Sequence, residues 1–259
     1  MKLEKITKTP DARQRRRYED ACAAAHGMDL LGERWALLVV RELMWGPRRF
    51  SDLRSALPGI SANVLTQRLE GLEAAGVLVR RRLPPPAASQ VYELTEWGYE
   101  SEPIFQALGR WAVRSPAHDP SMPLSAASLM LSLRAMFAAE RVGGFAARIG
   151  LVVDGQAFLA EVANGRIAIA ARAPDEADVV LAAEAPVIGG AIYGGVPLAA
   201  LEADGVLEIT GDRAVAQRFV TLYSLPPKVG TGPASALPER RDPVRHDDLP
   251  LTSTAGRNT

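Results

Sequence analysis

The hydrophobic positions of residues 46–82 predict two short helices, a tight turn between them, and a strand. The apolar residues of the first helix recur at helical spacing, at Phe50, Leu53 and Leu57. Pro58-Gly59 ends this helix, and Ser61 is a suitable N-cap for the next. The buried stripe of that next helix is predicted from Leu65, Leu69 and Leu72. Gly76 ends it, and an apolar run then leads into three arginines, Arg80, Arg81 and Arg82.

Helices are also predicted on both sides of this stretch. Apolar residues within residues 18–45 recur at helical intervals, and Gly32 separates two helices there. After the arginines, a second strand is predicted over residues 90–94, which gives a two-stranded hairpin. Thr95 is a suitable cap for one long helix running to about Val113. Helix, tight turn, helix and hairpin follow one another in the order of a winged helix-turn-helix.

Residues 124–225 predict an α+β domain with an antiparallel sheet and helices on one side. A helix is expected over residues 125–140, and three short strands follow it. Asp154-Gly155 and Asn164-Gly165 separate these strands, and both dipeptides favour tight hairpin turns. The remaining predicted elements are a strand over 177–184, helices over 185–195 and 197–203, a strand over 205–211, and a helix capped by Asp212 and ending near Tyr223.

The length of the chain, 259 residues, favours two domains rather than one. The predicted organisation is a flexible basic arm over 1–17, a winged helix over 18–115, a linker over 116–123, an α+β domain over 124–225 and a disordered tail over 226–259. No apolar run approaches the roughly 18 residues of a membrane span. No apolar segment follows the first charges as in a secretory signal. A cytoplasmic protein with no membrane partner is therefore expected.

Charge is distributed unevenly between the two halves of the chain. The net charge is zero, but residues 1–115 hold 18 Lys and Arg against 14 Asp and Glu. Residues 116–259 hold 12 Lys and Arg against 16 Asp and Glu. The small basic excess of the first half favours an anionic partner such as double-stranded DNA.

The helix that follows Ser61 suits the major groove of DNA, which is about 12 Å wide. With its leucines facing the core, base-reading contacts are predicted from Ser61, Ala62, Asn63, Thr66 and Gln67. Phosphate contacts are predicted from Arg48, Arg49 and Arg68, and wing contacts from Arg80, Arg81 and Arg82. From the residues alone, two alternatives stay open: these arginines form an ordinary solvated face, or the winged helix binds protein.

Several short motifs occur in order within residues 22–114. They are Gly32-x-x-Trp35, Gly46-Pro47-Arg48-Arg49-Phe50, Pro58-Gly59-Ile60-Ser61, Leu65-Thr66-x-Arg68-Leu69 and Tyr92-x-Leu94-Thr95-x-x-Gly98. This set resembles the HxlR family of bacterial winged-helix regulators, relatives of the MarR type. The resemblance implies a homodimer that binds an operator of two inverted half-sites and represses or activates nearby genes. The wing tip, from Pro84 to Ser89, departs from the acidic or polar residues that the family often has there.

The single cysteine, Cys22, excludes an internal disulfide and, with three scattered histidines, does not make a usual zinc site. No metal and no cofactor are expected. A cysteine before the first helix is typical of the HxlR family, and some members use it as a redox or electrophile sensor. Cys22 is thus a candidate redox sensor, because Arg15, Arg16 and Arg17 would lower its thiol pKa. The alternative is a small buried hydrophobic residue.

Three segments of the second half share a pattern with one lipid-binding family. They are Ala177 to Leu181, Pro197 to Leu201 and Gly205 to Asp212, and they resemble the sterol-carrier-protein domain. The resemblance implies an apolar pocket for a hydrophobic small-molecule effector. The candidate ligand-binding residues are Ile188, Ile192, Tyr193, Leu198 and Leu201. The alternative is that these side chains pack a closed core.

Residues 124–225 carry none of the usual catalytic motifs, so an enzyme is not expected. The leading interpretation is a homodimeric DNA-binding transcriptional regulator whose second domain senses a hydrophobic small molecule. One alternative is a constitutive regulator whose second domain only dimerises or docks. Another is a lipid-binding protein with a protein-binding winged helix.

Overall fold

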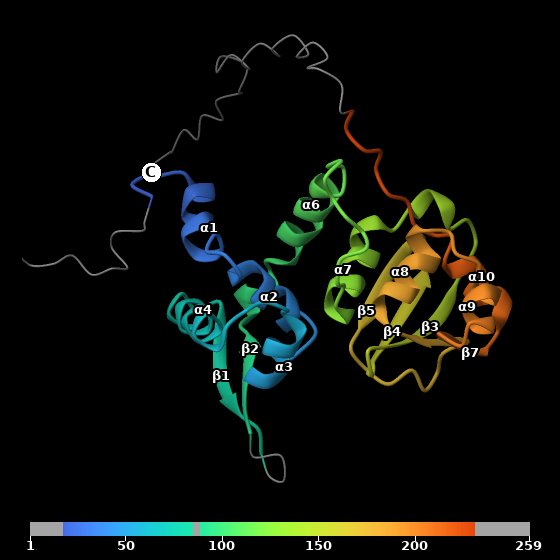
Figure 1. Ribbon diagram of the computed structural model, residues 1–259, viewed down its shortest axis with the longest axis horizontal. Helices are drawn as coiled ribbons and strands as arrows, with labels where there is room; N and C mark the ends of the chain where they lie inside the picture. The colour runs from blue at the N-terminus through green and yellow to red at the C-terminus, as the bar shows by residue number, and fades with distance from the viewer. Residues whose placement is uncertain (1–17, 85–88, 231–259) are drawn as a thin grey trace, which may run out of the picture.

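Two hydrophobic cores organise the chain, one in each predicted domain (Figure 1). The computed structural model describes residues 18–84 and 89–230. The predicted basic arm, the wing tip at 85–88 and the tail from residue 231 lie outside the described residues. The predicted α+β class is confirmed, because a winged helix-turn-helix precedes a domain in which helices cover one sheet.

The winged helix follows the apolar pattern of its sequence. Its elements are α1 (Ala23–Leu31), α2 (Ala36–Leu43), α3 (Phe50–Ala56), α4 (Ala62–Ala74), β1 (Leu78–Arg82), β2 (Gln90–Leu94), α5 (Glu96–Tyr99) and α6 (Glu102–Ala112). Leu53, Leu65 and Leu69 are fully buried in its core. β1 and β2 pair antiparallel and form the wing, with Arg80 opposite Tyr92.

The long helix predicted from Thr95 to Val113 is wrong in one respect, because the structure divides it into α5 and α6. Thr95 does cap α5: its hydroxyl accepts a hydrogen bond of 3.0 Å from the backbone N–H of Gly98. The break has a local cause. Pro103, in the first turn of α6, has no N–H to donate to the carbonyl of Tyr99, so a continuous helix would lose that bond.

The second domain is built on a five-stranded sheet with the order β5-β4-β3-β6-β7. Its elements are α7 (Ala126–Met136), a 3-10 turn (Ala139–Arg141), β3 (Ala147–Val153), β4 (Gln156–Ala163), β5 (Arg166–Ala170), β6 (Val179–Ala183), α8 (Ala185–Tyr193), α9 (Leu198–Ala203), β7 (Leu207–Gly211) and α10 (Arg213–Phe219). The last helix, α10, ends at Phe219, whereas the sequence predicted an end near Tyr223. Residues 226–230, predicted as the start of a disordered tail, pass the end of α6, where the Val229 N–H donates to the Arg114 carbonyl at 2.8 Å.

The sheet is mixed, which corrects the prediction of a wholly antiparallel one. β3 pairs antiparallel with β4 but parallel with β6. The two hairpins were predicted correctly: Asp154, Gly155, Asn164 and Gly165 all have positive φ, as tight hairpin turns of this kind require. A hairpin turn fixes only the strands that it joins, so the pairing of β3 with β6 depended on tertiary packing.

One face of the sheet carries the helices, as predicted. Along β3 the side chains alternate, and Ile149, Leu151 and Val153 are fully buried in the same core as residues of α7, α8 and α10. Arg148, on the opposite face of β3, is exposed. This arrangement places α7 between the sheet and the winged helix (Figure 1).

The two domains are joined along α2 and α7. Trp45, just after α2, packs against both hydrophobic cores. Arg134 of α7 lies over its ring, with 4.6 Å between the guanidinium carbon and the ring centroid. The same guanidinium donates two hydrogen bonds of 2.6 Å to the carboxylate of Glu102 in α6. We call Trp45, Arg134 and Glu102 the seam.

A buried charge lies beside the seam. Glu42 of α2 is only 1% exposed, and its carboxylate accepts a 2.7 Å hydrogen bond from the hydroxyl of Ser125. Arg41 pairs with the same carboxylate at 2.7 Å. Burial of a charge is tolerated where it is paired and hydrogen-bonded in this way.

Candidate DNA-binding surface

The start of α4 is fixed by Ser61. Its hydroxyl accepts a hydrogen bond of 3.3 Å from the backbone N–H of Val64, which is the role predicted for an N-cap. This bond satisfies one of the free N–H groups of the first turn. The first turn of α4 is therefore a defined helical end, and it begins at the residue that the sequence indicated.

The polar face of α4 is open to solvent. Asn63, Thr66 and Gln67 are exposed, Ala62 is half-buried, and the leucines of the opposite face are buried. α4 lies on the side of the winged helix that is turned away from the second domain (Figure 1). The predicted base-reading side chains therefore share one surface that the second domain leaves uncovered.

The wing supplies cations close to this surface. Arg80 pairs with Glu73 of α4 at 2.7 Å and lies 5.6 Å from the centroid of the Tyr92 ring. Arg81, on the other face of β1, pairs with Glu93 at 2.8 Å. Arg82 is exposed, and its side chain has no hydrogen bond or ion pair with any residue that the structure describes.

The three arginines predicted to contact phosphate have different surroundings. Arg49 is exposed next to the start of α3. Arg68 is half-buried and pairs with Glu33 at 3.2 Å. Arg48 is also half-buried, and its guanidinium donates a hydrogen bond to Gln156 of the second domain. Both partners are distant in sequence, so the pattern of α3 and α4 gave no sign of them.

Cys22 lies at the N-terminus of α1, and its thiol is exposed rather than buried. Hydrogen bonding from the backbone N–H groups of Ala25 and Ala24 lowers the pKa of this thiol. The predicted cause, the charge of Arg15 to Arg17, lies outside the described residues. Helix N-termini favour thiolates, since their free N–H groups carry partial positive charge.

The predicted ligand-binding residues belong to the core of the second domain. Ile188, Ile192 and Leu198 are buried there, and Tyr193 and Leu201 pack against it, partly buried. The hydroxyl groups of Tyr193 and Ser132 are 2.9 Å apart and hydrogen-bonded. Two surface hollows lie elsewhere, one of about 530 Å³ beside α6 and one of about 510 Å³ beside the start of α8.

The sequence analysis missed the residues that join the domains. Glu42 follows Val39 at the spacing of a buried stripe, and a charge in such a position was the available signal. Trp45 and Arg134 gave no comparable signal, because an indole packs in the core of its own domain as readily as against another domain, and an arginine is usually exposed.

The part of the chain that the structure describes holds neither a cluster of metal-ligating side chains nor a membrane-spanning helix. No three His, Cys, Asp or Glu side chains gather there as a metal site would require. None of its helices has the length and apolar character needed to cross a membrane.

A helix-turn-helix made by α3 and α4, followed by an arginine-bearing wing, defines the class of winged helix-turn-helix proteins. Comparison with known families gives the same class: the model of the HxlR-like helix-turn-helix family matches residues 30–119. The chain belongs to this family. A second family model, that of the SCP-2 sterol transfer family, matches residues 131–224, so an SCP-2 domain follows the winged helix.

The relatives of the chain are HTH-type transcriptional regulators. YvaP of Bacillus subtilis, described as an uncharacterised regulator of this type, is 39% identical over 85 residues, which are 33% of this chain and 79% of YvaP. YodB of the same organism is 39% identical over 83 residues, which are 32% of this chain and 74% of YodB. The solved structure of reduced YodB is 33% identical and covers 39% of this chain and all of that chain, with a TM-score of 0.35.

Proposed function

We propose that the protein is a homodimeric transcription regulator that binds an inverted-repeat operator and responds to a hydrophobic small molecule. The observation that carries the DNA-binding part is the exposed polar face of α4 beside the wing. Asn63 and Gln67 bear amides that pair with adenine through two hydrogen bonds, and Thr66 bonds to bases or phosphate. Arg49 and Arg82 are exposed cations that suit phosphate contacts on either side.

The homodimer is supported by an apolar stripe on α6. Ile104 is 50% and Leu108 44% exposed, and their spacing puts them on one helix face. Large side chains that gather on a surface in this way mark a contact with another protein. Met28 of α1 is also 53% exposed, so the partner's N-terminal helices offer a matching apolar surface. A two-fold dimer of this kind presents its two α4 helices to half-sites about 34–36 Å apart.

The sensing role is supported by the SCP-2 match and by the seam. Trp45, Arg134 and Glu102 connect the second domain to the DNA-binding domain through packed and hydrogen-bonded groups. A ligand that prefers one arrangement of the two domains shifts DNA affinity by its difference in affinity for the two arrangements, typically about 1–3 kcal/mol.

Selection of bound duplexes from a random library tests the DNA-binding part. The wild type is expected to select an inverted repeat, and Asn63→Ala or Gln67→Ala to relax the preference at one position in each half-site. Each lost bidentate contact costs about 1–3 kcal/mol. Unchanged selectivity in both variants would remove α4 as the base-reading helix. Sedimentation of the intact protein tests the dimer, and a monomer in wild type would contradict it.

Cys22 supports a second candidate signal. Its exposed thiol and lowered pKa are the properties of an oxidation-sensitive cysteine. Operator binding by the wild type and Cys22→Ser, each measured before and after mild peroxide treatment, tests this role. A loss that occurs equally in both proteins would exclude Cys22 as the sensor.

A further inference from the structure

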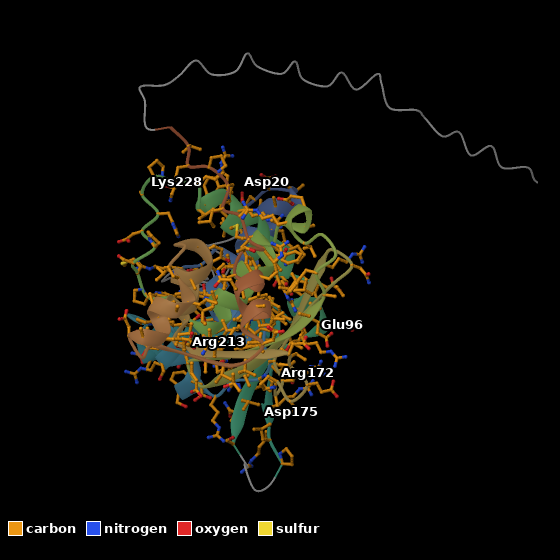
Figure 2. All side chains as sticks on the ribbon, turned by 90° about the vertical axis from the view of Figure 1, so that its right-hand side faces the viewer. Asp20, Glu96, Arg172, Asp175, Arg213 and Lys228 are labelled. Carbon is orange, nitrogen blue, oxygen red and sulfur yellow. The ribbon has the colours of Figure 1, made fainter. Side chains whose placement is uncertain are left out.

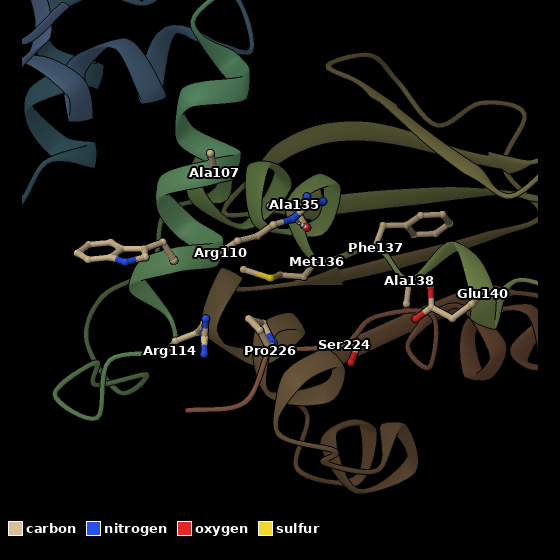
Figure 3. Close-up of a pocket in the computed structure, with 11 residues that line it drawn as sticks. Ala107, Arg110, Arg114, Ala135, Met136, Phe137, Ala138, Glu140, Ser224 and Pro226 are labelled. Carbon is tan, nitrogen blue, oxygen red and sulfur yellow. Dashed lines mark hydrogen bonds between the residues drawn. The ribbon is translucent and has the colours of Figure 1, made fainter. Parts of the chain in front are cut away.

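An open hollow of about 530 Å³ lies where the DNA-binding domain meets the second domain (Figure 3). One wall is the C-terminal half of α6, with Arg110 and Trp111, and Arg114 just beyond it. The opposite wall is the end of α7, with Met136, and the segment that carries Pro226. Its volume falls within the range of small-molecule sites, about 300–1,000 Å³.

Arg110 and Arg114 are one helical turn apart and face the same space. The Arg110 Nε donates to the carbonyl of Ala135, and the Arg114 Nε donates to the carbonyl of Pro227 at 3.2 Å. Each guanidinium is therefore held through its Nε atom. The terminal nitrogens of both have no hydrogen-bond or ion-pair partner among the residues that the structure describes.

The charge of the lining is positive. Among its described lining residues, Glu140 is the one carboxylate, against the two guanidinium groups. Lys228 adds a nearby cation, because its Nζ donates to the carbonyl of Ser115, next to Arg114, at 2.9 Å. The neighbouring Glu102 carboxylate is engaged by Arg134. Two fixed guanidinium groups with free terminal N–H donors suit a carboxylate or another oxyanion.

The rest of the lining is mostly apolar. Trp111 is 72% exposed, and Met136, Phe137 and Ala138 form the other side. Contact between aromatic or aliphatic walls and an apolar ligand removes both from water and so favours binding, whereas a bare inorganic anion would leave the walls in water. An apolar wall beside a pair of cations suits an amphipathic ligand with one negatively charged end.

We infer that this hollow binds an amphipathic carboxylate, whose oxyanion pairs with Arg110 and Arg114 and whose apolar part lies along Trp111 and Met136. The ligand touches α6 of the DNA-binding domain and the end of α7 in the second domain at the same time. The inference deepens the proposed sensing function by giving it a site and a ligand class, and it rests on that function only for the effect on DNA.

Calorimetric titration of the full-length protein with decanoate tests the site, with decanol as the uncharged match. Decanoate below its micelle-forming concentration is expected to bind more tightly than decanol. In Arg110→Gln/Arg114→Gln, decanoate affinity should fall about tenfold or more, because charge-assisted hydrogen bonds are lost, while decanol affinity stays nearly unchanged. Equal decanoate affinity in wild type and this variant would overturn the inference.

Arg172→Gln is the matched control. Arg172 is a half-exposed cation of the second domain that does not line the hollow. It lies far from Lys228 (Figure 2), and its loss should leave decanoate affinity unchanged. Ala107→Trp is a second variant, which keeps both arginines and fills the hollow from an exposed position on α6. It should weaken decanoate and decanol alike. If the double arginine variant does not fold, unchanged binding in Ala107→Trp overturns the inference.

The same titrations separate the site from the regulatory function. If the wild-type protein binds no decanoate, the inference is overturned. This holds whether the hollow is empty or is filled by a second copy of the chain. Binding that survives both hollow variants belongs elsewhere, such as the core around Ile188, and also overturns it, although sensing by the second domain would remain. Decanoate that binds as expected but leaves operator affinity unchanged supports the site and contradicts sensing through it.

Discussion

The indole Nε1 of Trp45 donates a hydrogen bond of 3.2 Å to the backbone carbonyl of Ala127, across the boundary between the two domains. The Trp45 ring also packs edge-on against Phe158 of β4, with 5.5 Å between the ring centroids. An indole that is fixed on several sides resists rotation, and here it joins the segment just after α2 to the first turn of α7 and to β4. The winged helix and the SCP-2 domain are therefore in direct, side-chain-specific contact.

Loss of the seam arginine is expected to weaken the whole fold. Arg134→Met removes the contact with the Trp45 ring and leaves the partly buried Glu102 carboxylate without its main partner. The free energy of unfolding should fall by about 1–3 kcal/mol. Urea unfolding followed by tryptophan fluorescence measures the change. Arg172→Met, at an exposed pair with Glu161, should stay within about 0.5 kcal/mol of wild type.

Arg82 is expected to contribute to DNA affinity without reading sequence. Its exposed side chain is unpaired among the described residues, so it is available to phosphate. Arg82→Ala should weaken binding to all duplexes alike and reduce the slope of log affinity against log salt by about one. Fluorescence anisotropy at several salt concentrations measures both effects. Arg213→Ala, on α10, is the control, and a loss confined to one sequence would contradict a phosphate role for Arg82.

Removal of the Tyr223 hydroxyl is expected to keep or raise stability. This hydroxyl is buried and has no hydrogen-bond partner among the described residues. A buried group of this kind costs about 1–3 kcal/mol, so Tyr223→Phe should unfold at equal or higher urea concentration. Tyr193→Phe is the matched change, and it should cost about 1 kcal/mol because it breaks the bond with Ser132. A clear loss of stability in Tyr223→Phe would reveal a partner for that hydroxyl.

Alkaline pH should destabilise the second domain. Burial raises the pKa of Tyr223 well above its ordinary value of 10, and it raises the pKa of Tyr193 in the same direction. Above pH 10 the unfolded chain therefore loses these protons while the folded chain keeps them, so stability is retained below that pH and falls above it. Unfolding free energies measured across this range should fall less steeply in Tyr223→Phe than in wild type.

Two glycines should respond in opposite ways to alanine. A Cβ at Gly98 would lie 2.1 Å from the backbone carbonyl oxygen of Val77, so Gly98→Ala must displace the wing or α5. We expect a loss of about 1–3 kcal/mol or more. A Cβ at Gly71, inside α4, meets nothing within 4 Å, and Gly71→Ala should gain about 0.5–1 kcal/mol from helix propensity. Thermal unfolding of both variants checks the sign.

The thiol of Cys22 should react at lower pH than a free cysteine. Hydrogen bonding from the N–H groups of Ala25 and Ala24 stabilises the thiolate and lowers the thiol pKa. The rate of alkylation by iodoacetamide, measured against pH, should therefore reach its midpoint below that of glutathione. Cys22 is the single cysteine of the chain, so the signal has one source. A midpoint equal to that of glutathione would contradict thiolate stabilisation.

The sequence by itself determined the order of elements and several of their ends. The stripe of Leu65 and Leu69 predicted α4, Ser61 predicted its cap, and Asp154-Gly155 predicted a hairpin turn. These features depend on helix periodicity and on turn conformations, which residues close in sequence control. Pro103 belonged to the same kind of signal and was overlooked, although it marks the break between α5 and α6.

Tertiary structure alone decided which distant groups meet. The parallel pairing of β3 with β6, the contact of Arg48 with Gln156 and the pair of Arg68 with Glu33 all join segments that no local pattern relates. The same holds for the hollow between α6 and α7, where Arg110 and Arg114 face apolar side chains of another domain. The physical reason is that periodicity shows which face of an element is buried, whereas the identity of its partner depends on how the complete set of apolar faces packs.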